Sequence, residues 1–517
     1  MRPLLILLMT SLSACGETTA NLPLNHWAYP FFERLEALGV INAMELRVRP
    51  VSRQIAAEWV RQSLQAAEKS PHLFSTGDRK LLEQLRGDFR DELGESAADA
   101  TPERHFYTLR EQETILHIDI LAAEQIDSRR SSGPSDQLLS HTTFGGNLRG
   151  QLGNSLAFFA HARNTLTRGE KRDPNDENFN PAKGEPVVTS GANVYRDQTT
   201  AYFVWQKSAF RLQAGKDEFD WGPFIGKGFA LSSNAPPADM LRLGFRLKKF
   251  SFNSMHAWLR SPLGQKYLAA HRLDLQLLRG LSLGFAETVV YGGRGVEPSY
   301  LNPLTFYHFA EHHLGDRDNN NIVADVVVTA FPRLTLAGEW YIDDMTSTKS
   351  WRNYFGNKFA WAVGGLWADA FNLRGLDLRF RYGQISPYVY SHWDSLNIYT
   401  HYDQIIGNRL GPNSDEFSFT LGKQFGRDFR LELNGRLSRK GTGEADTRTR
   451  PHVGDRKEFL KGVVERRSGA GFRIVDQLIR DLFVSISYDY EDVRNADLVA
   501  GRSRFHHWVR FRIDCDY

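Results

Sequence analysis

From about residue 113 to the C-terminus, apolar and polar residues alternate along the chain. The runs Leu241–Lys248, Leu376–Tyr382 and Leu482–Tyr490 place every second side chain on the same face. A period of two predicts β-strands with one apolar and one polar face. The run at the C-terminus, residues 505–517, is the clearest. One of its faces carries Phe505, His507, Val509, Phe511, Ile513, Cys515 and Tyr517.

The links between these runs alternate between short and long. The short links cover residues 153–155, 206–209, 248–250, 279–280, 331–333 and 425–428, and the long polar links cover residues 128–140, 167–197, 217–239, 292–321, 343–358, 385–415 and 439–456. One rim of tight turns and one of extended loops is typical of an outer-membrane barrel, whereas a soluble β-sandwich does not segregate its connections by length. We therefore expect an all-β fold over residues 113–517. It is a transmembrane antiparallel outer-membrane β-barrel of about eighteen strands, with both ends on the periplasmic side.

Residues 25–95 have a helical pattern instead. Apolar residues recur at helical spacing in His26–Gly39, and Ser52 is placed to cap a second helix. The order HWAYPFFERLEALGVI and then SRQIAAEWV resembles one S-layer-homology repeat, a motif that attaches proteins to cell-wall polymers. We expect a small periplasmic helical module, with residues 96–112 as a linker to the barrel. The module contacts peptidoglycan or another cell-wall polymer or, as the alternative, only packs against the end of the barrel.

Residues 1–20 read as a secretory signal peptide, with a basic Arg2, an apolar run and then small residues. Leu12–Cys15 resembles the lipobox of bacterial lipoproteins, which would make Cys15 a lipidated residue; cleavage after Ala20 is the alternative. No other apolar run approaches the ~20 residues that a membrane-spanning helix needs, so any crossing is by strands. Cys15 and Cys515 are the two cysteines, too few for a disulfide framework or a cysteine-based metal site.

Composition agrees with a barrel. The 517 residues are 12% aromatic and include 43 glycines, yet the mean hydropathy is −0.43. An apolar, aromatic-rich surface that faces lipid and a polar lumen offset each other in the mean hydropathy. The 64 basic and 61 acidic residues are interspersed and give a net charge of +3, which argues against a nucleic-acid partner. Because both signs fall on the polar phase of the strands, we expect ion pairs to brace the lumen.

One carboxylate breaks the strand pattern. Glu287 falls in the phase of the apolar residues Leu281, Leu283 and Phe285. A carboxylate that faces lipid is unfavourable. Either the strand bulges at this position, or Glu287 lies above the apolar belt.

Four motifs follow one another along the barrel sequence. They are GKDEFDWGPF (215–224) with ALSSNAPP (230–237); Glu287–Tyr291 with Tyr300–Pro303, Glu311, Asp318–Asn319 and Asp325; Glu339–Asp344; and Leu410–Asp415. Together with the leading HWAY helix, their order and spacing resemble the Wzi-type capsule-assembly family of outer-membrane proteins. The resemblance implies an eighteen-stranded, largely occluded barrel with a periplasmic helical module. It also implies binding of group-1-type capsular polysaccharide at the cell surface and no enzymatic activity.

The first functional hypothesis is therefore a non-catalytic barrel that binds surface polysaccharide and assists capsule or exopolysaccharide assembly or attachment. Sugars are held by aromatic faces and by hydrogen bonds to carboxylates and amides. Aromatic residues in the loops could instead form the interfacial girdle of the barrel. The candidate polysaccharide-binding residues are Asp217, Glu218, Asp220, Trp221, Glu287, Tyr291, Tyr300, Asn302, Glu311, Asp343 and Asp344.

Two alternatives remain, a passive porin-like channel and a glycan- or lipid-modifying enzyme. A channel requires an unplugged lumen. A glycosidase requires two carboxyls about 5–9.5 Å apart, and the spacing of Asp217 and Glu218 along the chain does not supply that distance. The sequence lacks Gly-x-Ser-x-Gly and His-Glu-x-x-His, and Glu311-His312-His313 lacks a second pair of metal ligands. We therefore expect no catalysis, no metal and no cofactor, and a monomer surrounded by outer-membrane lipid.

Overall fold

The computed structural model describes residues 18–95, 105–132, 136–169, 187–190, 193–426, 428–441, 456–479 and 482–516. Most of the predicted signal peptide, including Cys15, lies outside the described residues. So do Tyr517 and parts of the linker 96–112 and of the long links 167–197 and 439–456. Among the helices that the structure describes, none is long and apolar enough to cross a membrane.

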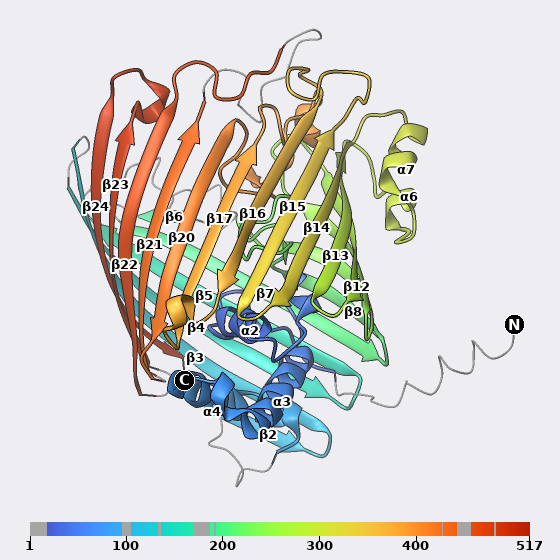
Figure 1. Ribbon diagram of the computed structural model, residues 1–517. Coiled ribbons are helices and arrows are strands. Elements are labelled where there is room, and N and C mark those ends of the chain that lie inside the picture. The colour runs from blue at the N-terminus through green and yellow to red at the C-terminus, as the bar shows by residue number, and fades with distance from the viewer. Residues whose placement is uncertain are drawn as a thin grey trace, which may run out of the picture.

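Most of the chain forms a closed antiparallel barrel of 18 strands (Figure 1). The barrel closes where β24 pairs with β3. The fold class that the alternation predicted is confirmed. The barrel strands are β3 (Thr114–Ser131), β4 (Gln137–Leu152), β5 (Leu156–Gly169), β7 (Asn193–Lys207), β8 (Phe210–Asp217), β10 (Ala238–Leu247), β11 (Phe250–Leu259), β12 (Lys266–Leu278), β13 (Leu281–Gly292), β14 (Asn319–Phe331), β15 (Leu334–Asp344), β16 (Lys358–Trp367), β17 (Leu376–Ile385), β20 (Ser414–Gln424), β21 (Phe429–Lys440), β22 (Glu465–Ile479), β23 (Leu482–Arg494) and β24 (Ser503–Asp516).

Short elements accompany the barrel strands. The strands β2 (Tyr107–Glu111) and β6 (Val187–Ser190) add to the edges of β3 and β7. The connections between barrel strands contain β9 (Asp220–Trp221), α6 (Pro298–Leu301), α7 (Tyr307–His313), η5 (Ala370–Asn372), η6 (Ser395–Asn397), β18 (Thr400–His401), β19 (Gln404–Ile405) and η7 (Ala496–Leu498).

Short and long connections alternate around the barrel as predicted. Pro332–Arg333 alone joins β14 to β15, whereas residues 386–413 join β17 to β20. The link predicted at 128–140 is shorter than expected, because the polar ends of β3 and β4 stay paired as a hairpin, with Arg129 opposite Gln137. We refer below to the short-turn rim and the long-loop rim.

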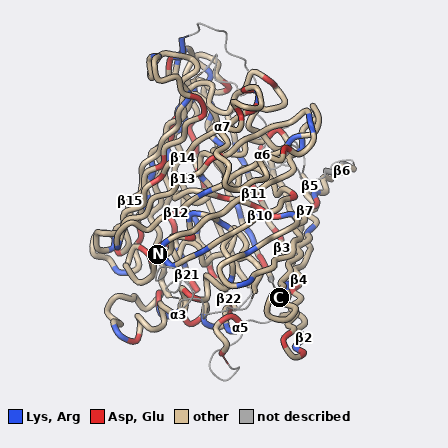
Figure 2. The backbone as a smooth tube through the Cα atoms, turned by 90° about the vertical axis from the view of Figure 1, so that its right-hand side faces the viewer, with Lys and Arg blue, Asp and Glu red and all other residues tan. Residues whose placement is uncertain are grey.

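The two faces of the barrel wall differ as the alternation requires. Phe285 of β13 and Leu241 of β10 are exposed on the outer face. On the lumen face, Arg272 of β12 pairs with Asp274 at 2.6 Å and with Asp325 of β14 at 2.6 Å. The second ion pair spans β13 and ties β12 to β14, so ion pairs brace the lumen as expected. Figure 2 shows basic and acidic residues distributed along the whole barrel rather than gathered at one place.

The N-terminal helices lie at the short-turn rim (Figure 1). They are α2 (Ala28–Ala37), η1 (Met44–Arg47), α3 (Arg53–Lys69), η2 (Pro71–Leu73), α4 (Thr76–Asp88) and α5 (Arg90–Leu93), with the short strand β1 (Val48–Arg49) between η1 and α3. Ser52 caps α3 as predicted, since its Oγ accepts the N–H of Ile55 at 3.2 Å.

A buried arginine fastens these helices to the barrel. Arg34 of α2 pairs with Asp78 of α4 at 2.7 Å. It also pairs with Asp369, in the turn between β16 and β17, at 2.7 Å, and with Asp377 of β17. Because one carboxylate from α4 and two from the barrel meet the guanidinium of α2, the helical module and the short-turn rim form one packed unit.

Candidate functional site

The loop that follows β8 does not project outward but folds into the barrel. Its strand β9 pairs with β1, with Val48 opposite Trp221 and Arg49 opposite Asp220. The segment from the long-loop rim therefore meets the N-terminal segment inside the lumen. Two residues of the motif GKDEFDWGPF, Asp220 and Trp221, form this junction.

The junction is buried and charge-paired. Arg49 and Asp220 are each 1% exposed, and the Arg49 Nε lies 2.9 Å from the Asp220 carboxylate. The same carboxylate oxygen accepts the N–H of Gly226 at 2.9 Å. Trp221 is buried in a cluster that includes Val48 and Phe229. Asp220 and Trp221 thus hold two parts of the chain together.

Asp217 and Glu218 lie just before this junction. The buried Asp217 accepts hydrogen bonds from Asn21 at 2.9 Å and from Gln213 at 2.7 Å. Glu218 is half-buried, and its burial, reinforced by the neighbouring Asp217 charge, raises its pKa to about 7. The first of these carboxylates contacts the N-terminal segment, like Asp220.

A second long loop covers the inward loop. Tyr390 and Tyr399, both in residues 386–413, stack with ring centroids 5.7 Å apart. The Tyr390 hydroxyl donates to the carbonyl oxygen of Phe229 at 2.8 Å. The buried cluster continues from Val48 through these rings to lumen-facing wall residues such as Leu268. Side chains therefore pack inside the barrel from the N-terminal segment to the long-loop rim, against the wall formed by β10–β17.

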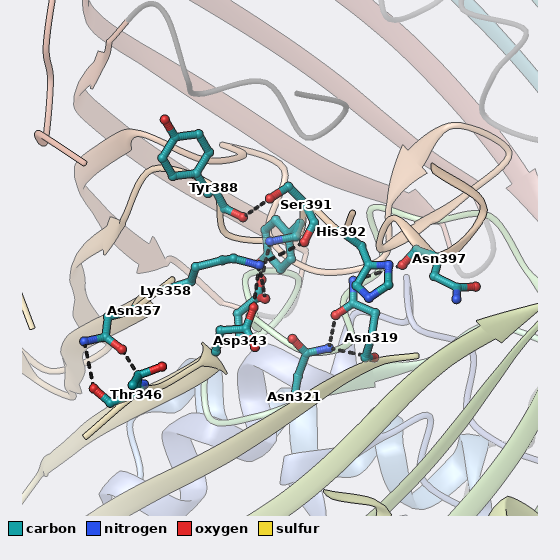
Figure 3. A network of polar contacts seen from close by, with 12 residues as sticks. Asn319, Asn321, Asp343, Thr346, Asn357, Lys358, Tyr388, Ser391, His392 and Asn397 are labelled. Atoms are coloured by element: carbon teal, nitrogen blue, oxygen red, sulfur yellow. Dashed lines mark hydrogen bonds and ion pairs between the residues drawn. The ribbon is translucent and has the colours of Figure 1, made fainter. Parts of the chain in front are cut away.

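Above this plug, a polar network joins the outer ends of β14, β15 and β16 to the covering loop (Figure 3). Lys358 Nζ lies 3.2 Å from the buried Asp343 and 2.7 Å from the exposed Asp344. It also donates to the carbonyl oxygen of Ser391 at 3.1 Å. The Tyr390 N–H donates to the other Asp343 oxygen at 2.5 Å. Asp343 fixes the covering loop, whereas Asp344 faces outward at the rim.

The remaining candidates belong to the loop 293–318 and the wall below it. Tyr291 and Tyr300 are buried, and the Tyr300 hydroxyl donates to Asp318 at 2.8 Å. Glu311 of α7 is also buried, and this burial, together with nearby carboxylates, raises its pKa to about 8. Asn302 is exposed after α6.

The structure explains why the carboxylate of Glu287 falls in the apolar phase of its strand. The register is continuous there, with Glu287 opposite His271 on one side and Ile322 on the other, so no bulge is present. The carboxylate accepts the N–H of Tyr307 at 2.9 Å and contacts the His271 ring nitrogen at 3.0 Å. The loop 293–318 thus covers Glu287 and shields it from the surroundings of the barrel.

Of the eleven candidates, Asn302 and Asp344 are exposed, Glu218 and Glu287 are half-buried, and the other seven are buried. Sequence reasoning missed Arg49 and Lys358, the two cations on which the carboxylates converge, since neither stands in a recognisable motif. Trp393, exposed two residues after Ser391, is also absent from the eleven candidates.

Comparison with known proteins now adds to this geometry. The family model of the capsule assembly protein Wzi matches residues 145–507. The chain belongs to the Wzi family. The recognition made from the four motifs is confirmed, and the protein is an outer-membrane β-barrel of the Wzi type.

A solved structure agrees in fold. It is Wzi of Escherichia coli, described as an outer-membrane protein involved in group 1 capsule assembly and a carbohydrate-binding β-barrel. It shares 13% identity over 95% of this chain and 99% of its own, with a TM-score of 0.59. OccAB1 of Acinetobacter baumannii is less similar, at 10% identity over 78% of this chain and 96% of its own, with a TM-score of 0.46. No curated protein sequence matches the chain.

Proposed function

We propose that this protein is a non-catalytic outer-membrane barrel that binds capsular or exopolysaccharide and assists its assembly or attachment. The observation that carries the proposal is the loop packed inside the barrel of a member of the Wzi family. The carbohydrate binding described for the Escherichia coli relative supports it. A porin-like role requires an open lumen, which the packed inward loop opposes.

The orientation follows from the rims. In bacterial outer-membrane barrels the short turns are periplasmic and the long loops are extracellular. We therefore place the helical module (25–95) in the periplasm, where contact with peptidoglycan or another cell-wall polymer is open to it. A signal peptide over residues 1–20, with or without lipidation of Cys15, is consistent with export to this compartment, and the linker 96–112 leads into the barrel.

The polysaccharide surface that we propose lies on the extracellular side, over the network of Lys358. Asp344 and Trp393 are exposed there and offer a carboxylate acceptor and an aromatic face. Asp343, Asp220 and Trp221 support this surface from below by fixing the two loops. In this arrangement the candidates divide into ligand contacts and residues that position them.

The direct test is binding of the purified monomer to surface polysaccharide from the strain that makes it, measured by surface plasmon resonance. Loss of one hydrogen bond to a charged group weakens binding by about 1.5–3 kcal/mol, so Asp344→Ala is expected to lower affinity about tenfold or more. Trp393→Ala is expected to act in the same direction. Trp351→Ala is the matched control, because Trp351 is equally exposed but stacks on Trp340 of the outer wall.

Deletion of the protein in its own strain tests the cellular role. We expect capsule to be released into the medium while total polysaccharide stays constant. Normal capsule retention in the deletion strain would refute a role in attachment. Steady ion conductance of the purified protein in a planar bilayer would favour the channel, and release of reducing ends from the polymer would favour an enzyme.

A further inference from the structure

The loop 293–318 packs against the outside of the barrel wall. Its buried residues Tyr300, Tyr307 and Ala310 contact Tyr267 and Val289. The neighbouring wall residues Leu268 and Val290 belong to the cluster inside the lumen. Because successive side chains of a strand point to opposite faces, Tyr267 and Val289 point outward. Figure 1 shows α6 and α7 outside the wall beside β12 and β13.

The wall is short where this loop docks. Strand β13 has 12 residues, which at about 3.4 Å each and a tilt of about 40° give a height of about 30 Å. The lipid-facing band of an outer-membrane barrel is about 25 Å tall, so β13 extends only a few ångströms beyond it. Glu287, which accepts the Tyr307 N–H, lies five residues from the end of β13, about 17 Å along the strand. The start of α7 is therefore fastened at the height of the membrane.

The surface of α7 that faces away from the wall has an apolar side and a polar side. Tyr307, Ala310 and Glu311 face the wall and are buried. At helical spacing, Phe306 and Phe309 fall on one side of this stripe. Both are about two-thirds exposed (66% and 64%), and the centroids of their rings lie 6.2 Å apart. Leu301 and Leu304 add further exposed apolar surface at 47% and 79%.

The other side of the helix is polar. His308 and His312 lie one turn apart, with ring centroids 4.4 Å apart, and both are exposed. The segment is thus mainly apolar along one edge, where His313 at the end of α7 is the polar residue, and polar along the other, as in helices that lie in a membrane interface.

We propose that the α6–α7 segment lies in the outer leaflet of the outer membrane, with Leu301, Leu304, Phe306 and Phe309 in contact with lipid acyl chains. The occupant is lipid because the apolar edge continues the lipid-facing wall, on which Phe285 is exposed two residues below Glu287. The segment widens the membrane contact of the barrel beside the long-loop mouth, and Glu287 is the positioning residue that fastens it. This inference does not depend on polysaccharide binding.

The test is the accessibility of a nitroxide label on α7 to oxygen, which partitions into lipid, and to a water-soluble nickel chelate. Labels replace Phe309 and His312 in separate chains that also carry Cys15→Ser and Cys515→Ser, since these are the two cysteines of the sequence. The full chain is studied in phosphatidylcholine nanodiscs, and the Cys15→Ser/Cys515→Ser chain without an added cysteine is the blank. Labels at Phe285 and Trp393 provide the lipid and water references, and heat-modifiable mobility on gels verifies folding.

We expect the ratio of oxygen to nickel collisions at Phe309 to approach that at Phe285, and the ratio at His312 to shift towards that at Trp393. A label at Phe306 repeats the measurement in case Phe309→Cys does not fold. Water-like ratios at both phenylalanine positions would overturn the proposal. Dipolar broadening between labels on two chains would identify a second copy as the occupant and would also overturn it.

Discussion

The Arg49–Asp220 ion pair offers the sharpest test of the loop packed inside the barrel. Asp220→Ala leaves the Arg49 guanidinium, which is 1% exposed, without its carboxylate. Removing one partner of a buried ion pair typically costs about 3–5 kcal/mol. The guanidinium keeps its bond to the Gly222 carbonyl oxygen at 3.1 Å, but the Gly226 N–H loses its acceptor. We expect the cost to fall on the contact between β1 and β9 rather than on the barrel wall.

The assay is the rate at which a protease cleaves the N-terminal module while the barrel remains folded in detergent. Where opening is fast relative to cleavage, this rate follows the population of the opened state. A loss of about 3–5 kcal/mol corresponds to an increase of about a hundredfold to a few thousandfold. Heat-modifiable mobility on gels reports the barrel separately and should not change.

Two variants make the result specific. Glu58 pairs with Arg246 at 2.8 Å, but both side chains are about one-third exposed, so Glu58→Ala should cost no more than about 1 kcal/mol. The double variant Arg49→Met/Asp220→Ala removes both charges and should recover most of the protection, because an apolar replacement of a buried pair is often neutral. Asp220→Ala behaving like Glu58→Ala would refute the reasoning.

Three further predictions follow from other contacts. Arg34→Met leaves three carboxylates at the short-turn rim without their shared cation. The rate of protease cleavage of the module should rise at least a hundredfold, which corresponds to a loss of about 3 kcal/mol of docking free energy. Trp221→Ala opens a cavity beside β1 that costs about 3–5 kcal/mol, and planar-bilayer recordings should show current bursts that the native protein lacks. The pKa of Glu311 is raised to about 8, chiefly by burial and then by Asp316, so the docked α7 gains stability below pH 4.5 that is lost as the pH rises through about 8. A nitroxide label at Phe309 should become more mobile between pH 5 and 9, and Glu311→Gln should abolish this change.

The sequence predicted the barrel well because a membrane imposes simple rules on it. Lipid on one side and polar side chains on the other enforce a period of two, which Leu241–Lys248 shows without interruption. The same alternation placed Arg272 and Asp274 on one face, where they form an ion pair. It failed at residues 128–140, because strands that extend beyond the membrane have polar residues on both faces and lose the pattern.

The sites were harder to predict, because their partners are distant in sequence. Asp220 meets Arg49 across 171 positions, and no local pattern connects them. Glu287 was the exception, since its place in an apolar phase marked it as unusual. Of the two explanations left open, the structure excludes the bulge, and Glu287, about 17 Å along β13 from its end, lies at the height of the membrane rather than above the apolar belt. The sequence did not predict that the loop 293–318 covers Glu287. This loop folds back over the wall through contacts of Tyr307 and Tyr300 with strands that are distant in sequence.

These long-range contacts also explain why three carboxylates stand within four residues of GKDEFDWGPF. Asp217 binds Asn21 and Asp220 binds Arg49, so two of the three join the loop to the N-terminal segment. The third, Glu218, sits between them with a pKa near 7 and is the only one left half-buried. A glycosidase would need two of these carboxyls to face one open cleft, whereas burial and pairing already engage two. We therefore propose that the acidic loop fixes the plug and that the sugar contacts lie above it, at Asp344 and Trp393.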